Sequence, residues 1–175
     1  MPEEGNLLRD IIIYLGKRTK LQSTRVQKLM YLIEAEYADR YGKRIMDYDF
    51  YHDRFGMNSL ELHNRVQALK DKNIRIEKYK TDIGEGFRVF IKPDTPDPHL
   101  PLEIKEVCDL ILRTYGQIKN VVVLANIAKR TLPFQGTPEG KKIDWSLLTD
   151  PCARGECNCQ LSEEGRRRLY EALNH

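Results

Sequence analysis

Apolar side chains recur at alternating spacings of four and three residues between positions 26 and 41, which predicts a helix. Leu29 and Leu32 widen this stripe beyond the single face that a surface helix needs, so we expect the helix to lie at the centre of the fold. The stripe itself consists of Val26, Met30, Ile33, Tyr37 and Tyr41. Ser23 or Thr24 is the expected N-cap, with Thr24 and Gln27 as a capping box, and Gly42 is the expected end.

Side chains alternate with a period of two from Asp47 to Arg54, which predicts a half-buried strand. One face carries Tyr48, Phe50 and His52, and the other carries Asp47, Asp49, Tyr51 and Asp53. The pair Phe55-Gly56 is expected to turn the chain. Asn58 or Ser59 then caps a helix that continues to about residue 71.

The remaining patterns predict further helices and one β-hairpin. Two β-rich runs, Ile74–Lys80 and Phe87–Lys92, are joined by the turn segment TDIGEG. Apolar stripes predict helices over 6–16, over about 102–115, from Asn120 to about Arg130, and from Ser162 onward. Residues 133–160 lack periodicity and are expected to be irregular.

These elements predict an α+β fold: about six helices around a small antiparallel sheet or β-hairpin, with winged-helix character. Residues 93–101 contain four prolines and are expected to form a stiff linker inside a domain that spans 1–135. Residues 136–175 are expected to add an irregular segment with cysteines and a last helix, packed on the same domain.

Composition and charge narrow the class of protein without naming a ligand. The chain has 175 residues, of which 41% are apolar and 31% charged, which is typical of a globular domain. No apolar run is long enough for a membrane span, and the first ten residues are acidic rather than basic, so we expect a cytoplasmic protein without a membrane partner. The net charge of +3 does not require a nucleic-acid partner.

The central segment resembles a known family. Lys28-Leu29-Met30-Tyr31 opens the helix, Tyr41-Gly42-Lys43-Arg44-Ile45 follows as a turn, and Phe55-Gly56 ends the strand. With Tyr115-Gly116 and Leu132-Pro133-Phe134 farther on, this pattern is similar to the Panacea domain of SocA-type antitoxins and of the related YwgA-like group. The likeness spans about residues 7–135, and Met57 stands where the family usually has proline.

The resemblance implies a non-enzymatic regulator that binds and neutralises a toxin-like protein partner, or adapts a partner to a protease. The expected partner surface is the loop that consists of Phe55, Gly56, Met57, Asn58 and Ser59, together with exposed parts of helix 58–71 and the hairpin. A homodimer is a further option. No motif of a known nucleophile, metalloprotease, phosphate-binding loop or dinucleotide fold is present, which favours a protein that is not an enzyme.

Two alternatives rest on other residues. Arg75, Lys78, Lys80 and Arg88 lie on the hairpin, where a winged helix has its wing, so duplex DNA is an alternative partner. The second alternative is a thiolate metal-binding or redox protein, based on Cys152, Cys157 and Cys159.

The cysteine cluster leaves three states open: a zinc or iron–sulfur site, a disulfide, or free thiols. Zinc needs four donors, and Cys108 is a candidate for the fourth, although its place on an inward helix stripe also suits an ordinary core cysteine. The acidic run Asp47–Asp53 with His52 has metal-ligand chemistry as well, but its alternation is better explained by a solvated strand face.

Overall fold

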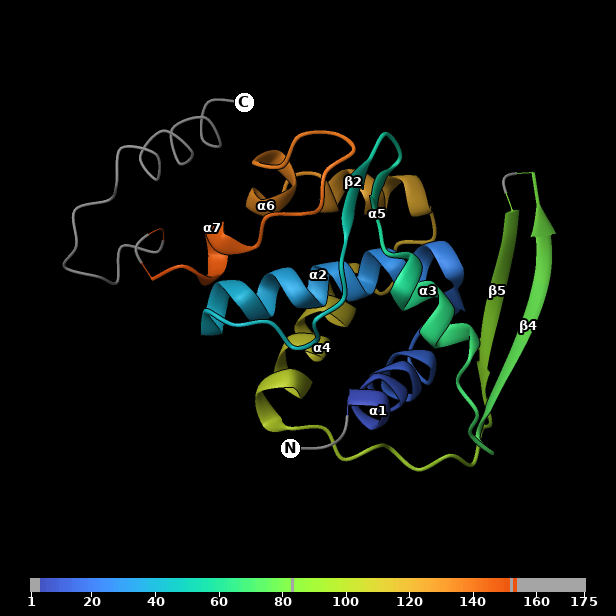
Figure 1. Cartoon of the computed structure of the whole chain (residues 1–175). Helices are drawn as coiled ribbons and strands as arrows, with labels where there is room; N and C mark the ends of the chain where they lie inside the picture. The colour runs from blue at the N-terminus through green and yellow to red at the C-terminus, as the bar shows by residue number, and fades with distance from the viewer. Residues whose placement is uncertain (1–3, 83, 152, 154–175) are drawn as a thin grey trace.

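The computed structural model describes residues 4–82, 84–151 and 153, and it has an α+β architecture (Figure 1). Its elements are α1 (Glu4–Gly16), β1 (Leu21–Gln22), α2 (Ser23–Tyr41), β2 (Tyr51–Asp53), β3 (Gly56–Asn58), α3 (Leu60–Gln67), β4 (Ile74–Thr81), β5 (Gly84–Ile91), α4 (Leu102–Tyr115), α5 (Val121–Ala128), α6 (Leu132–Gln135) and α7 (Ser146–Thr149). The predicted fold class is confirmed.

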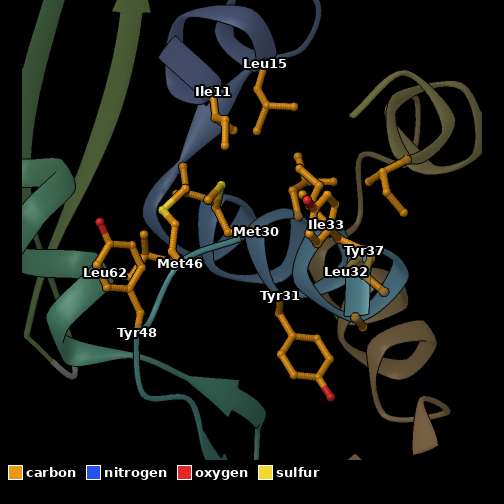
Figure 2. Packing of buried hydrophobic residues seen from close by; sticks show 14 of the residues in the cluster. Ile11, Leu15, Met30, Tyr31, Leu32, Ile33, Tyr37, Met46, Tyr48 and Leu62 are labelled. Atoms are coloured by element: carbon orange, nitrogen blue, oxygen red, sulfur yellow. The ribbon is translucent and has the colours of Figure 1, made fainter. Parts of the chain in front are cut away.

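Helix α2 lies at the centre of the core, as its broad apolar stripe predicts. It contacts α3, α4, α5 and α7, and side chains on all of its sides are buried. Figure 2 shows Ile11 and Leu15 of α1 pointing at α2 from one side, while Tyr31 projects from α2 on the opposite side. Burying apolar surface around a whole helix, rather than along one stripe, makes α2 the element on which the others assemble.

The ends of α2 agree only partly with the sequence. Gly42 has a left-handed φ of 64°, and its N–H donates to the carbonyl of Ala38, so the predicted stop is confirmed. The predicted capping box is wrong, because Gln22 is the N-cap and makes no side-chain cap bond. Gln27 instead bonds the backbone of a distant residue, Ser59. A local cap is therefore replaced by a tertiary contact.

A buried carboxylate holds the chain where it leaves α2. The side chain of Glu34 accepts hydrogen bonds from the backbone N–H groups of Ile45 and Met46, at 3.1 and 2.9 Å. The Arg44 guanidinium lies 3.5 Å from the same carboxylate, as an ion pair rather than a hydrogen bond, and donates to the Tyr48 carbonyl at 2.7 Å. This network fixes the segment that leads from α2 into β2.

The strand predicted over Asp47–Arg54 is shorter than expected. Met46, Tyr48 and Phe50 are buried and Asp47 and Tyr51 exposed, so the predicted alternation is confirmed. Only Tyr51–Asp53 forms a strand, which pairs with Gly56–Asn58 as a small hairpin. Farther back, the Phe50 carbonyl accepts from the Ile143 N–H at 2.7 Å, so this part of the segment bonds an irregular stretch rather than a strand.

The main sheet has the order β1-β5-β4, and all its strands are antiparallel. The predicted hairpin of β4 and β5 is confirmed; Figure 1 shows it standing at one side of the helices, next to α3. Strand β1 has only two residues, too few for a period of two to appear in the sequence. Helix α3 precedes the hairpin along the chain, separated from it by residues 68–73, and β1 lies on the far edge of the hairpin.

The second half of the chain packs on the same core. Helices α4 and α5 follow the predicted stripes, and Asn120 caps α5 by accepting from the Val122 N–H. The proline-rich segment lies against α1, where Arg18 and Lys17 pair with Asp97 at 2.6 and 2.8 Å. Two short helices, α6 and α7, correct the prediction of an irregular 133–160. The helix predicted from Ser162 lies outside the described residues.

Candidate functional site

A cleft of about 580 Å³ opens at the N-terminal end of α2. One wall is α3, a second is the end of the β4–β5 hairpin, and a third is the turn between β2 and β3. Its volume lies in the range of ligand-binding clefts. The loop that the resemblance marks as the partner surface lines this cleft, so the cleft is the candidate site.

Gln27 fastens the loop to the central helix. Its side-chain amide donates to the Ser59 carbonyl at 2.8 Å and accepts from the Ser59 N–H at 3.0 Å, so it pairs with that residue as a neighbouring strand would. The Ser59 hydroxyl then accepts from the Leu62 N–H and caps α3. The Gln27 side chain therefore fixes the position of the loop and, through Ser59, the position at which α3 begins.

Lys28 brings a buried positive charge to the cleft. The residue is 6% exposed, and its ammonium donates to the Met57 carbonyl at 2.6 Å. Burial lowers the pKa of Lys28 to about 8; the carboxylate of Asp53 opposes this shift, and Lys129 adds to it. No carboxylate among the described residues lies within ion-pair distance of this ammonium. The ammonium thus has hydrogen-bonding capacity left for a ligand.

Gly56 has a backbone conformation that favours glycine, with a φ of 111°. A Cβ at this position would also lie 3.4 Å from the Lys28 ammonium nitrogen and 3.7 Å from Ala125. These are ordinary contact distances, so the positive φ, rather than lack of space, is what strains any other residue here.

Large apolar side chains are exposed around the cleft. Phe55 is 62% exposed, with the Arg54 guanidinium 4.6 Å above its ring, and Leu60 is 69% exposed. Leu60 also lines a smaller neighbouring hollow together with Tyr51, which is 46% exposed. Exposed aromatic and aliphatic side chains grouped beside a cleft are typical of protein interfaces. We call Tyr51, Phe55 and Leu60 the apolar rim.

The five residues of the predicted partner surface divide into two groups. Phe55 and Asn58 are exposed, whereas Gly56, Met57 and Ser59 are buried. Met57 belongs to the hydrophobic core, and Ser59 is the cap of α3, so their side chains have structural roles. Of the expected loop, only Phe55 and Asn58 are therefore exposed, while the exposed Leu60 belongs to the helix that was also expected to take part. Tyr51 was missed by the sequence argument.

The four basic residues of the hairpin lie on two different faces. Arg75 is opposite Phe90 and Arg88 opposite Glu77, so both arginines share one face with Tyr79. Their guanidinium groups lie over the Phe90 and Tyr79 rings, at 4.7 and 5.2 Å.

Lys78 is opposite the buried Phe87, and Lys80 is opposite Glu85, which places both lysines on the other face. Arg75 is also paired with Glu77 at 2.9 Å. Helix α3 adds little positive charge, since its exposed Arg65 is paired with Glu61. The basic residues of the hairpin therefore do not combine into one patch.

Of the acidic-aromatic run, Asp53 lines the cleft, whereas Asp49 and His52 make separate contacts. Asp49 pairs with Lys142 at 2.5 Å, and the Tyr31 hydroxyl bonds the Thr131 hydroxyl at 2.7 Å. The His52 ring bonds the Thr137 carbonyl and stacks on Phe134. These side chains diverge into separate contacts, which agrees with our preference for a structural strand face.

Of the cysteines, only Cys108 lies in the described part of the chain. It is fully buried in the hydrophobic core, and this burial raises the pKa of its thiol to about 12. Cys152, Cys157 and Cys159 lie outside the described residues. Within the described ranges, no three His, Cys, Asp or Glu side chains are grouped as metal ligands would be.

Comparison of the chain with models of protein families, with curated proteins and with solved structures found no match. Among the helices that the structure describes, none combines the length and the apolarity of a membrane span. A proposal for the function therefore has to be argued from the geometry of the cleft and its apolar rim.

Proposed function

We propose that this chain is a non-enzymatic regulator that binds a protein partner through the cleft and the apolar rim. The resemblance to SocA-type antitoxins implies a partner of the toxin kind, which binding would neutralise or deliver to a protease. The observation that supports this proposal most is the grouping of Phe55 and Leu60 beside the cleft, each more than 60% exposed. Large side chains of this type are the anchors of protein interfaces.

Loss of the apolar rim is expected to abolish neutralisation. The assay is growth of bacteria that express the product of the neighbouring gene, with and without this chain. We expect the unchanged chain to restore growth, and the double variant Phe55→Ser, Leu60→Ser to fail, with partner affinity at least about tenfold weaker because two anchors are lost.

The matched control is Leu102→Ser on α4, since Leu102 is 70% exposed, almost the same as Leu60. Its variant should restore growth like the unchanged chain. The proposed function would be wrong if the unchanged chain neither forms a complex with that gene product nor restores growth. Equal rescue by the rim and control variants would instead show that partner binding uses another surface.

The sheet order favours duplex DNA as a second candidate partner, because a wing-like hairpin follows α3. We expect Arg75→Ala with Arg88→Ala to weaken DNA binding at all sequences and to reduce the slope of log affinity against log salt by about 2. Lys78→Ala with Lys80→Ala removes the same charge from the opposite face and serves as the control. Fluorescence titrations with duplex DNA that stay flat for the unchanged chain would exclude this candidate.

A further inference from the structure

The outer edge of β4 is open. Strand β4 lies at one end of the sheet order, and in the part of the chain that the structure describes it pairs only with β5. Helices α1 and α2 pack on β5, whereas no described helix packs extensively on β4, which is the outermost strand in Figure 1. An unpaired edge on a strand of eight residues is a template for a further strand.

The hydrogen-bonding groups of this edge follow from the hairpin register. The Lys92 N–H donates to the Asn73 carbonyl, which is the first bond of the β4–β5 ladder. Hydrogen-bonded pairs alternate along an antiparallel ladder, so the odd-numbered residues of β4 direct their backbone groups toward β5. The even-numbered residues, which include Ile76 and Lys78, therefore direct theirs toward the open edge.

The side chains of β4 make this edge complementary to a second copy of itself. Arg75 and Glu77 lie on the same face of the sheet, are both exposed, and form an ion pair of 2.9 Å. When a second β4 runs antiparallel and the two Ile76 residues face each other across a twofold axis, Arg75 of each copy lies opposite Glu77 of the other. These are non-hydrogen-bonded positions, where side chains on two strands come closest. The four charges then alternate in sign around the axis.

Neighbouring registers of the same strand pair are unfavourable. An axis at Arg75, at Glu77 or at Lys78 would place that charged side chain directly opposite its own copy. Like charges in directly opposite positions destabilise a pair of strands. Of residues 75–78, Ile76 is therefore the one position at which a twofold axis joins an apolar pair and two pairs of opposite charge.

We propose that two copies of this chain pair through β4, antiparallel and about a twofold axis at Ile76. The three-stranded sheets of the two copies then form one sheet of six strands. This inference goes beyond the proposed function and does not depend on it, because Arg75, Ile76 and Glu77 do not line the cleft. Each copy of the dimer keeps its own cleft and its own apolar rim.

The backbone contact between the copies is short. Ile76 exchanges two hydrogen bonds with its own copy, and the Lys78 N–H of each chain donates to the Ile74 carbonyl of the other. The pairing ends there, because the Ile74 N–H already donates to the Asp71 carbonyl at 3.1 Å, where the chain turns into β4. Because the helices pack on β5 rather than on β4, they leave room for the second copy.

Sedimentation equilibrium of the full chain at concentrations from about 10 µM to about 1 mM tests for the dimer. We expect a monomer–dimer equilibrium that shifts toward the dimer as the concentration rises. In the chain labelled with ¹⁵N, the amide signals of Ile76 and Lys78 should move with concentration more than that of Glu77, whose N–H is bonded inside the hairpin. A chain that stays monomeric over this whole range would overturn the inference.

Two charge reversals test the register. Glu77→Arg places arginine opposite Arg75 of the other copy, and Arg75→Glu places glutamate opposite Glu77. Each variant alone should raise the dissociation constant of the dimer at least about tenfold. Both side chains are exposed, so neither variant should lower the melting temperature by more than a few degrees.

An equimolar mixture of these two variants is the decisive measurement. One copy then carries two glutamates and the other two arginines, so both cross-strand pairs again join opposite charges. We expect the mixture to form a dimer at least as stable as that of the unchanged chain, although the ion pair inside each chain stays broken. A mixture that dimerises no better than either variant alone would overturn the inference.

Lys78→Pro tests the backbone pairing, because it removes an N–H that points to the open edge and is not used by β5. Lys78→Ala is its matched control, since it removes the same charge and keeps the N–H. We expect Lys78→Pro to weaken the dimer at least about tenfold, and Lys78→Ala to leave it at least as stable as that of the unchanged chain. Equal dissociation constants for the two variants would contradict pairing through the edge of β4.

Discussion

Replacing Glu34 by alanine is expected to lower the free energy of unfolding by about 3–5 kcal/mol. The carboxylate is 1% exposed and is the acceptor for the backbone N–H groups of Ile45 and Met46. Alanine would leave both donors without a partner and remove the counter-charge of Arg44, whose side chain is 14% exposed. Urea unfolding followed by circular dichroism would measure the loss, as a lower midpoint with an unchanged m-value.

Glu34→Gln and pH distinguish the acceptor role of Glu34 from its charge. Glutamine keeps one acceptor oxygen, so it should cost less than alanine, about 1–3 kcal/mol. Burial raises the pKa of Glu34 from 4.5 to about 7, although Arg44 and the two N–H groups oppose that shift. As pH rises, Glu34 therefore loses its proton at a lower pH in the unfolded chain than in the folded chain. Its contribution to the free energy of unfolding falls as pH rises from 4.5 to 7. This account would be contradicted if the alanine variant were as stable as the unchanged chain. It would also be contradicted if the free energy of unfolding of the glutamine variant depended on pH as steeply as that of the unchanged chain between pH 4.5 and 7.

The longer helices could be predicted from the sequence because each has an apolar stripe, whereas α6 and α7, with four residues each, are too short to show one. The network around Glu34 could not, since a charged residue between Ile33 and Ala35 carries no sign that it is buried. The backbone groups that bond Glu34 belong to Ile45 and Met46, which come within reach only because the chain turns back at Gly42. The missed cap of α2 has a similar cause, because the sequence shows that Gln27 can bond locally but not that Ser59 comes within reach.

The candidate site was predicted in part for the same reason. The Phe55-Gly56 turn was identified as a partner surface, and Phe55 is exposed. Period-two alternation does not tell which of Met57 and Asn58 points inward when β3 has only three residues. Lys28 appeared in the sequence only as part of the family-like helix opening. Its burial is set by the β2–β3 turn, which lies across α2 and cannot be seen from local spacing.

The two halves of α2 hold the site from both ends. Gln27 and Lys28, near its start, bond the backbone of Ser59 and Met57. Glu34, two turns farther on, bonds the backbone where the chain re-enters after Gly42. The segment between these anchors includes the β2–β3 hairpin and carries Tyr51 and Phe55 of the apolar rim. A rigid central helix therefore positions a surface that is otherwise built on short strands and turns.

Replacing Tyr31 by alanine is expected to lower the free energy of unfolding by about 3–5 kcal/mol, because no neighbouring backbone can fill the space. The side chain is fully buried, and its ring packs against Phe50 and Trp145 at centroid distances of 5.4 and 5.3 Å. Tyr31 points away from α1, so this loss falls on the contacts between α2 and the C-terminal segments (Figure 2). Thermal and urea unfolding of the variant would measure it.

Tyr31→Phe separates the ring from its hydroxyl, which bonds the Thr131 hydroxyl. Phenylalanine keeps the packing and should cost only about 1 kcal/mol, the net worth of one hydrogen bond. A double-mutant cycle with Thr131→Val should show a coupling of similar size, because the two hydroxyls share that bond. Tyr31 lies one turn beyond Gln27 and Lys28 on the same side of α2, but it does not line the cleft and its hydroxyl bonds Thr131, so Tyr31→Phe should leave partner neutralisation intact. A loss as large as that of alanine would show that the hydroxyl, rather than the ring, holds these segments together.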